Sequence, residues 1–186
     1  MMRFTELDER LRAVAHAPGL LALVRRLVGD DRVVMIQDMA LLKPPGGGRE
    51  KPWHQDNAFF PFEPGTPIIG VWIALDEATP ANGCMHVRPG SHLAGPAVHF
   101  RRRDWQLCDA DVLAAREDEP VSDVTVPLPA GGALFFDGLL HHGTPENRTR
   151  TRRRALQLHY VPAAAVRVPE ERRLAVFGSG GKNVSC

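Results

Sequence analysis

Two histidines and an aspartate stand at positions from which they could bind one metal ion. His54 and Asp56 are two residues apart, and in an extended strand side chains at that spacing point to the same face. His142 lies far along the chain, directly after an apolar stretch, and could return to the same strand end across a pair of sheets. Two imidazoles and one carboxylate leave further coordination positions open, which is the ligand set of non-haem iron(II) oxygenases. These residues therefore predict an iron site.

Simpler interpretations of the same histidines exist. A lone His-x-Asp is common by chance, and a buried imidazole that is hydrogen-bonded to its neighbour would explain it equally well. His141 competes with His142 for the metal, because strand alternation turns only one of two adjacent residues inward. The remaining histidines of the strand regions are expected to be structural or surface residues: His86, His92, His99 and His159.

An arginine and a threonine extend the constellation. Arg153 begins the last predicted strand, and its planar guanidinium is suited to bidentate capture of a carboxylate. Thr144 offers a hydroxyl between His142 and Arg153. A metal with a buried arginine is what a 2-oxo dicarboxylic acid needs, with chelation at one end and a salt bridge at the other. Zinc also accepts two histidines and a carboxylate, but a hydrolase has no use for an oxo-acid anchor.

Short apolar stretches between glycine and proline turns must position these residues. Strands are expected at 33–42, around 53–56, and at 68–75, 84–88, 121–128, 133–136 and 155–161. Many short strands, with helices mainly at one end, predict an all-β core in the form of a two-sheet jelly roll.

The flanking segments have different patterns. Residues 1–30 predict a helical N-terminal cover, with apolar residues at helical spacing up to Val14 and a second helix from Leu20 to Val28. Residues 93–120 lack strand alternation and are expected to form an insertion that acts as a lid, with a helix beginning at Asp104. Residues 166–186 lose all periodicity and predict a flexible C-terminal tail after a single domain spanning 1–165.

Composition excludes several classes of protein. The 186 residues suffice for one domain with a full core, and a formal charge of +1 gives no general attraction to nucleic acid or to a membrane surface. No apolar run approaches the roughly 18 residues needed for a membrane span. Three cysteines without metal-type spacing argue against a disulfide framework, so a cytoplasmic location is expected.

The sequence resembles the phytanoyl-CoA dioxygenase family of iron(II)/2-oxoglutarate-dependent oxygenases. The resemblance rests on motifs that occur in order between Met35 and Tyr160, among them Trp53-His54-Gln55-Asp56, Arg88-Pro89-Gly90-Ser91-His92, and His142-Gly143-Thr144 followed by Arg153. It implies a double-stranded β-helix (jelly roll, cupin-like) with iron held by His54, Asp56 and His142, because the family ligand stands immediately before Gly-Ser/Thr. The implied co-substrate contacts are Met39, Trp72, Thr144 and Arg153, and Gln37 matches a pocket glutamine of the related ectoine hydroxylases.

The resemblance also implies a reaction. Such an enzyme would use Fe(II), O2 and 2-oxoglutarate to hydroxylate a C–H bond of a small organic or lipid-like substrate, with release of succinate and CO2. The carboxylate of Asp56 favours hydroxylation, because related halogenases carry a small residue at that position. Family members have a longer region before Met35, which includes a lysine that contacts the co-substrate. The alternatives are therefore an inactive shortened member, or a cupin-like metal protein that is a hydrolase, an isomerase or a binding module. The primary substrate and the oligomeric state stay open.

Overall fold

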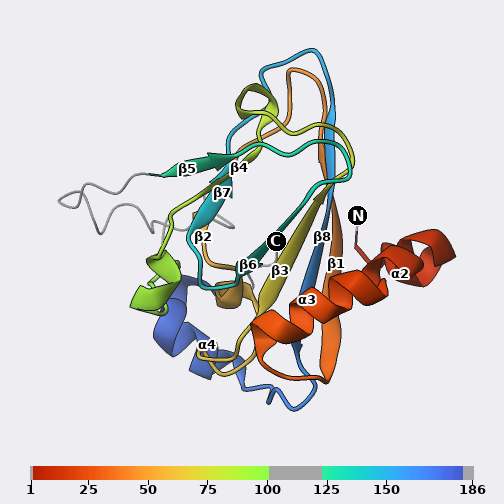
Figure 1. The fold of residues 1–186 in the computed structure, drawn as a ribbon. Helices are drawn as coiled ribbons and strands as arrows, with labels where there is room; N and C mark the ends of the chain where they lie inside the picture. The colour runs from red at the N-terminus through yellow and green to blue at the C-terminus, as the bar shows by residue number, and fades with distance from the viewer. Residues whose placement is uncertain (1, 101–122, 182–186) are drawn as a thin grey trace.

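The computed structural model describes residues 2–100 and 123–181, and two antiparallel four-stranded sheets pack together there (Figure 1). The first sheet has the order β1 (Val33–Lys43), β8 (Arg153–Pro162), β3 (Ile69–Ala74), β6 (Ala133–Asp137). The second has the order β2 (Lys51–His54), β7 (His142–Thr144), β4 (Met85–Val87), β5 (Val124–Val126). The predicted strands at 33–42, 68–75, 84–88, 133–136 and 155–161 correspond to β1, β3, β4, β6 and β8.

Successive side chains of the central strand β8 point to opposite faces of the first sheet. Leu156, Leu158 and Tyr160 belong to one apolar cluster, which lies under the N-terminal helices. Gln157 and His159 alternate with them and line a cavity on the opposite face. This alternation follows from the two-residue period of a strand, and it places the polar residues of β8 between the two sheets.

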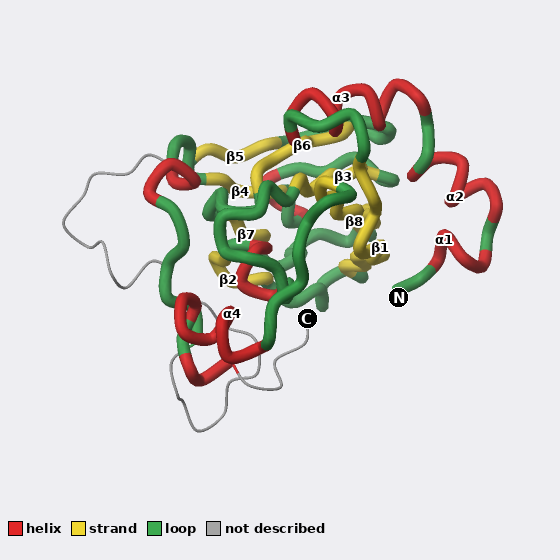
Figure 2. The backbone as a smooth tube through the Cα atoms, turned by 90° about the horizontal axis from the view of Figure 1, so that it is seen from below, coloured by secondary structure: helices red, strands yellow, loops and turns green. Residues whose placement is uncertain are grey.

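The N-terminal segment forms three helices: α1 (Phe4–Leu7), α2 (Glu9–Ala15) and α3 (Pro18–Val28). Asp8 interrupts the first predicted helix because its backbone is extended and its side chain caps α2. The last helix begins at Pro18, a favourable first position, and ends at Gly29, whose φ of 76° suits glycine. Figures 1 and 2 show α3 along one side of the first sheet, and its fully buried Val24 packs into the cluster beneath.

A bulge in β1 aims its second half at the interior. The pairing of β1 with β8 shifts register between Met35 and Gln37. Before the shift, Met35 packs against the cluster under the helices; after it, Gln37, Met39 and Leu41 line the cavity between the sheets. An extra residue in one strand has this re-aiming effect. Gln37, the polar residue that interrupts the apolar run, therefore marks the point at which the strand changes the face that it turns toward the cavity.

The C-terminal part differs from the predicted flexible tail. Residues Glu170–Phe177 form helix α4, and the Phe177 side chain is buried. The backbone amides of His99 and Phe100 both donate to the Phe177 carbonyl, at 2.7 and 2.9 Å. The helix packs through Leu174, Val176 and Phe177. These residues do not repeat at a regular helical spacing within so short a segment, so the hydrophobic pattern of the sequence does not predict the helix. Most of the predicted 93–120 insertion, including the helix expected at Asp104, lies outside the described residues.

No helix within residues 2–100 and 123–181 has the length and apolar character needed to cross a membrane.

Candidate metal centre

The predicted ligands converge at the end of β2. His54 is the last residue of β2, and Asp56 is the first residue of a short 3-10 helix, η1 (Asp56–Phe59). The Asp56 Oδ1 atom lies 3.3 Å from His54 Nε2 and 3.5 Å from His142 Nε2. One ligand atom from each residue lies within 4.8 Å of the others, and the three could hold a metal ion. The expectation that His54 and Asp56 share one strand is wrong: the chain turns into a helix between them.

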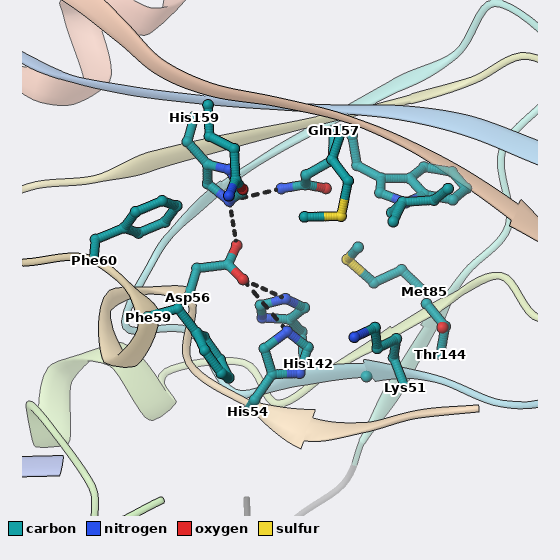
Figure 3. Close-up of a pocket in the computed structure, with 15 residues that line it drawn as sticks. Lys51, His54, Asp56, Phe59, Phe60, Met85, His142, Thr144, Gln157 and His159 are labelled. Carbon is teal, nitrogen blue, oxygen red and sulfur yellow. Dashed lines mark hydrogen bonds and ion pairs between the residues drawn. The ribbon is translucent and has the colours of Figure 1, made fainter. Parts of the chain in front are cut away.

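Backbone carbonyls fix both imidazole rings. His54 Nδ1 lies 2.7 Å from the Pro52 carbonyl oxygen, and His142 Nδ1 lies 2.9 Å from that of Leu140. A carbonyl only accepts, so each Nδ1 carries a proton, and in the neutral ring the lone pair is therefore on Nε2. Both Nε2 atoms point toward Asp56 (Figure 3). This tautomer, held by the second ring nitrogen, is the one that metal-binding histidines use.

The charges at the centre also suit a cation. Burial by itself would raise the pKa of Asp56, but the facing imidazoles of His142 and His159 outweigh it and hold that pKa well below its usual range. Burial lowers the pKa of His54, and the neighbouring His142 lowers it further. An ionised carboxylate therefore faces the neutral imidazole of His54. The same carboxylate outweighs burial and raises the pKa of His142, so metal binding would displace a proton wherever that ring is charged. Such a donor set fits a divalent metal ion, which needs both groups deprotonated.

A cavity opens beside the three ligands. Its volume is about 600 Å³, a value that includes its open mouth. The predicted co-substrate contacts Gln37, Met39, Trp72 and Thr144 all line it. Phe59 and Phe60 form part of its wall, whereas Phe62 packs against Phe60, Ile68 and Val161 in the core behind. These four predicted contacts thus lie around the three candidate metal ligands.

Arg153 is a buried cation without an acidic partner among the described residues. Its exposed fraction is 1%, and its Nε and Nη1 atoms have no hydrogen-bond partner there. The guanidinium carbon lies 5.3 Å from the centre of the Trp72 ring, whose Nε1 donor is also unpartnered. Arg153 lines a second cavity, which shares Leu41, Lys51 and Thr144 with the first. Buried charges without a partner are costly, so this arrangement indicates a binding site for an anion.

His141 is not one of the three candidate ligands. Its side chain is buried, and its backbone amide donates to Ser91 Oγ at 2.8 Å. The three residues that could hold a metal include His142 but not His141. The pairing of β7 with β2 explains the choice, because His142 stands directly opposite His54 in the register of these strands.

Gln55 and His99 support the strand end from behind. The Gln55 side chain donates to the carbonyls of Gly95 and Leu139, at 2.9 and 2.8 Å, and accepts from the Ala97 amide at 2.8 Å. His99 Nε2 accepts the Gln55 backbone amide at 2.7 Å. This buried network connects residues 95–99 to the turn between His54 and Asp56, and it uses His99 in its neutral form.

We expect His99 to make stability depend on pH. Burial lowers its pKa to about 3, against about 6.5 for an unfolded histidine. Below pH 6.5 the unfolded chain binds a proton that the folded chain does not, so the free energy of unfolding falls as pH falls. The expected slope from this residue is about 1.4 kcal/mol per pH unit between roughly pH 6 and pH 4. Urea denaturation at a series of pH values over that range should show that the free energy of unfolding of His99→Gln depends less steeply on pH than that of the unaltered protein. An equal dependence on pH in the two proteins would contradict this prediction.

Comparison with known proteins agrees with this site. A sequence model described as Phytanoyl-CoA dioxygenase (PhyH) matches residues 2–155. The chain belongs to the phytanoyl-CoA dioxygenase family. This family member is 33% identical over 159 residues to the mouse phytanoyl-CoA dioxygenase domain-containing protein 1, covering 84% of this chain and 54% of that protein. With human peroxisomal phytanoyl-CoA dioxygenase it shares 29% identity over 161 residues, covering 84% and 47%. The chain spans about half the length of these curated relatives.

Solved structures also resemble this member of the phytanoyl-CoA dioxygenase family. The epimerase SnoN, in complex with Fe3+, alpha ketoglutarate and nogalamycin RO, superposes with a TM-score of 0.75 at 26% identity, covering 91% of this chain and 65% of that one. The alpha ketoglutarate dependent carbocyclase SnoK superposes with a TM-score of 0.76 at 24% identity, covering 97% and 70%. These likenesses, and the two-sheet architecture, confirm the predicted cupin-like jelly roll.

His159 and Lys51 are among the cavity residues that sequence reasoning missed. His159, expected to be structural or a surface residue, lies 2.8 Å from Asp56 Oδ2 through its Nε2 atom. Lys51 lines the cavity beside Thr144, its partner across β2 and β7. A signal for His159 was present in the sequence: it stands six residues after Arg153 on one strand, so both side chains fall on the same face.

Proposed function

We propose that this protein is an iron(II)- and 2-oxoglutarate-dependent dioxygenase that hydroxylates a C–H bond of a small organic or lipid-like molecule and releases succinate and CO2. The observation that carries the proposal is the buried guanidinium of Arg153, which has no acidic partner within residues 2–100 and 123–181 and lies next to a cavity that contains two histidines and a carboxylate. Membership of the phytanoyl-CoA dioxygenase family and the likeness to SnoN, solved with Fe3+ and alpha ketoglutarate, support it.

The residues would divide the work. His54, Asp56 and His142 would hold the iron through two Nε2 atoms and one carboxylate oxygen. Arg153 would bind the distal carboxylate of 2-oxoglutarate, with the Thr144 hydroxyl and the Trp72 Nε1–H as further donors. When bound, iron(II) with 2-oxoglutarate and O2 supplies the oxidising power for the reaction. The apolar walls of the cavity would keep bulk water from the reacting centre.

The lining of the same cavity indicates the polarity of the substrate. Met39, Met85, Phe59 and Phe60 make much of its lining apolar, while Gln37 and Gln157 add amides on the β1 and β8 side. A small organic substrate with an apolar body and one or two polar groups fits this lining. SnoN and SnoK are named as an epimerase and a carbocyclase. We propose hydroxylation for this chain because its family is named for a dioxygenase, and the carboxylate of Asp56 favours hydroxylation over halogenation.

Cellular location is part of the proposal. Cys84 is buried and forms no disulfide in the part of the chain that the structure describes, which agrees with a reducing compartment. We therefore propose the cytoplasm; human phytanoyl-CoA dioxygenase is named as peroxisomal.

Succinate release tests the proposal. Protein loaded with iron(II) without oxygen, and then given 2-oxoglutarate and O2, should produce succinate in a reaction that requires all three. Glutarate, which has both carboxylates but no oxo group, should inhibit without being consumed. In a screen of small apolar acids and alcohols, a compound that is a substrate should then raise the rate of succinate production. A zinc-loaded protein that hydrolyses esters, together with an iron-loaded protein that makes no succinate, would favour a hydrolase instead.

A further inference from the structure

The two oxygens of Asp56 have different neighbours. Oδ1 lies between the Nε2 atoms of His54 and His142, at 3.3 and 3.5 Å. Oδ2 points the other way and lies 2.8 Å from Nε2 of His159 (Figure 3). His159 is itself buried, with an exposed fraction of 2%. Of the two carboxylate oxygens, therefore, only Oδ1 faces the other metal ligands.

The chemistry of this contact fixes the proton on His159. An ionised carboxylate only accepts hydrogen bonds, so His159 Nε2 must carry a proton and donate it to Oδ2. The Gln157 amide lies 3.1 Å from the same ring nitrogen. Because a ring N–H cannot accept, the amide orientation compatible with this contact turns the Gln157 oxygen toward the ring. The edge-on ring of Phe60, with its centre 4.8 Å away, holds the imidazole from the other side.

We propose that His159 is a positioning residue for the metal centre: it holds Oδ2 so that Asp56 presents a single oxygen to the metal. This inference rests on the proposed function. One carboxylate oxygen on the metal leaves more positions for a chelating co-substrate than two would. Without the His159 hydrogen bond, the carboxylate is free to rotate about χ2, so that both oxygens can approach the metal or both can turn away from it.

The position of His159 on β8 makes the restraint rigid. β8 is hydrogen-bonded on both sides, and His159 stands opposite Gln37 of β1 and Gly70 of β3. Arg153, which would bind the far end of the co-substrate, is on the same face of the same strand. One central strand would thus set both the geometry of the carboxylate ligand and the place of the oxo-acid anchor.

Paired amide substitutions test this role. The side-chain nitrogen of glutamine reaches about as far as histidine Nε2, whereas that of asparagine reaches only as far as Nδ1. We therefore expect His159→Gln to bind Mn(II) and Co(II) within a few-fold of the unaltered protein. His159→Asn and His159→Phe should bind both metals about 10–100-fold more weakly, the usual effect of losing a group that orients a metal ligand. Calorimetric titration without oxygen measures these affinities.

Tyr160→Phe provides the matched control. Tyr160 is the next residue on β8 but faces the helices, where its hydroxyl donates to the Ala15 carbonyl at 2.6 Å. This variant also loses one buried hydrogen bond, so any general loosening of β8 should affect it equally. Its metal affinity should stay within twofold of the unaltered protein. Equal weakening in Tyr160→Phe and His159→Phe would overturn the positioning role.

Two further readouts separate this inference from the proposed function. At saturating Co(II), the ligand-field absorption spectrum of His159→Asn should differ from that of the unaltered protein, and its affinity for 2-oxoglutarate should be lower. His159→Gln should restore both. If the unaltered protein binds metal and 2-oxoglutarate but all His159 variants match it, the positioning role is wrong and the proposed function stands. If the unaltered protein binds no metal, both fail.

Discussion

Replacing Asp56 by asparagine is expected to abolish 2-oxoglutarate turnover and to weaken iron(II) binding by at least about 100-fold, more than the roughly 10–100-fold typical of losing a residue that only orients a ligand. The substitution keeps the shape of the side chain and removes its charge. Asp56 supplies the negative charge in the group formed with His54 and His142. Without it, a cation would meet two imidazoles whose ring centres are 4.2 Å apart, with no charge to offset its loss of hydration.

Asp76→Asn is the control for this variant. Asp76 also forms an ion pair, with Arg154 at 2.9 Å, but it does not line the cavity. Calorimetric titration with iron(II) under nitrogen and a succinate assay should give unaltered values for Asp76→Asn. Circular dichroism shows whether either variant still folds. Full 2-oxoglutarate turnover in a folded Asp56→Asn protein would remove this carboxylate from the metal centre and contradict the proposed function.

The strands could be predicted because their apolar runs and turn residues repeat locally. β1, β3 and β8 were expected within one or two residues of their observed ends, since each is long and bounded by glycine, proline or charged residues. β5 is shorter than the expected 121–128 strand, in the part of that segment that the structure describes. Helix α4 was missed because its stability depends on tertiary contacts with Phe100 and Ala58, which leave no regular pattern in the sequence.

The three candidate ligands could be predicted because their motifs resemble those of the phytanoyl-CoA dioxygenase family. The geometry in which these residues meet could not be predicted from the sequence. Asp56 begins a 3-10 helix whose second amide, that of Asn57, donates to the Gly138 carbonyl at 3.1 Å. A Cβ at Gly138 would lie 2.1 Å from the Asn57 side-chain oxygen, so the turn depends on a close approach between distant segments. The contact of His159 with Asp56 spans 103 residues, and only the folded arrangement brings the two together.

Arg153→Leu is expected to raise the KM for 2-oxoglutarate by roughly 100-fold or more and to leave iron(II) affinity unchanged. Removing one partner of a buried charge pair costs about 2–5 kcal/mol of binding, and each 1.4 kcal/mol corresponds to tenfold. The folded protein itself should not be destabilised, because the guanidinium is buried without an acidic partner among the described residues and burial already lowers its pKa to about 10. Thermal unfolding of the metal-free variant measures this second effect.

A comparison of two oxo acids makes the Arg153 prediction specific. 2-Oxobutyrate has the same chelating end as 2-oxoglutarate but no distal carboxylate. The unaltered protein should therefore prefer 2-oxoglutarate strongly, and Arg153→Leu should lose most of that preference because only the distal carboxylate contacts the guanidinium. Arg154→Leu, which removes the adjacent guanidinium and its pairing with Asp76, should keep it. If Arg153→Leu retains the full preference, the anion that this buried arginine binds is not the distal carboxylate, and the cavity it shares with Lys51 and Thr144 must hold a different acid group.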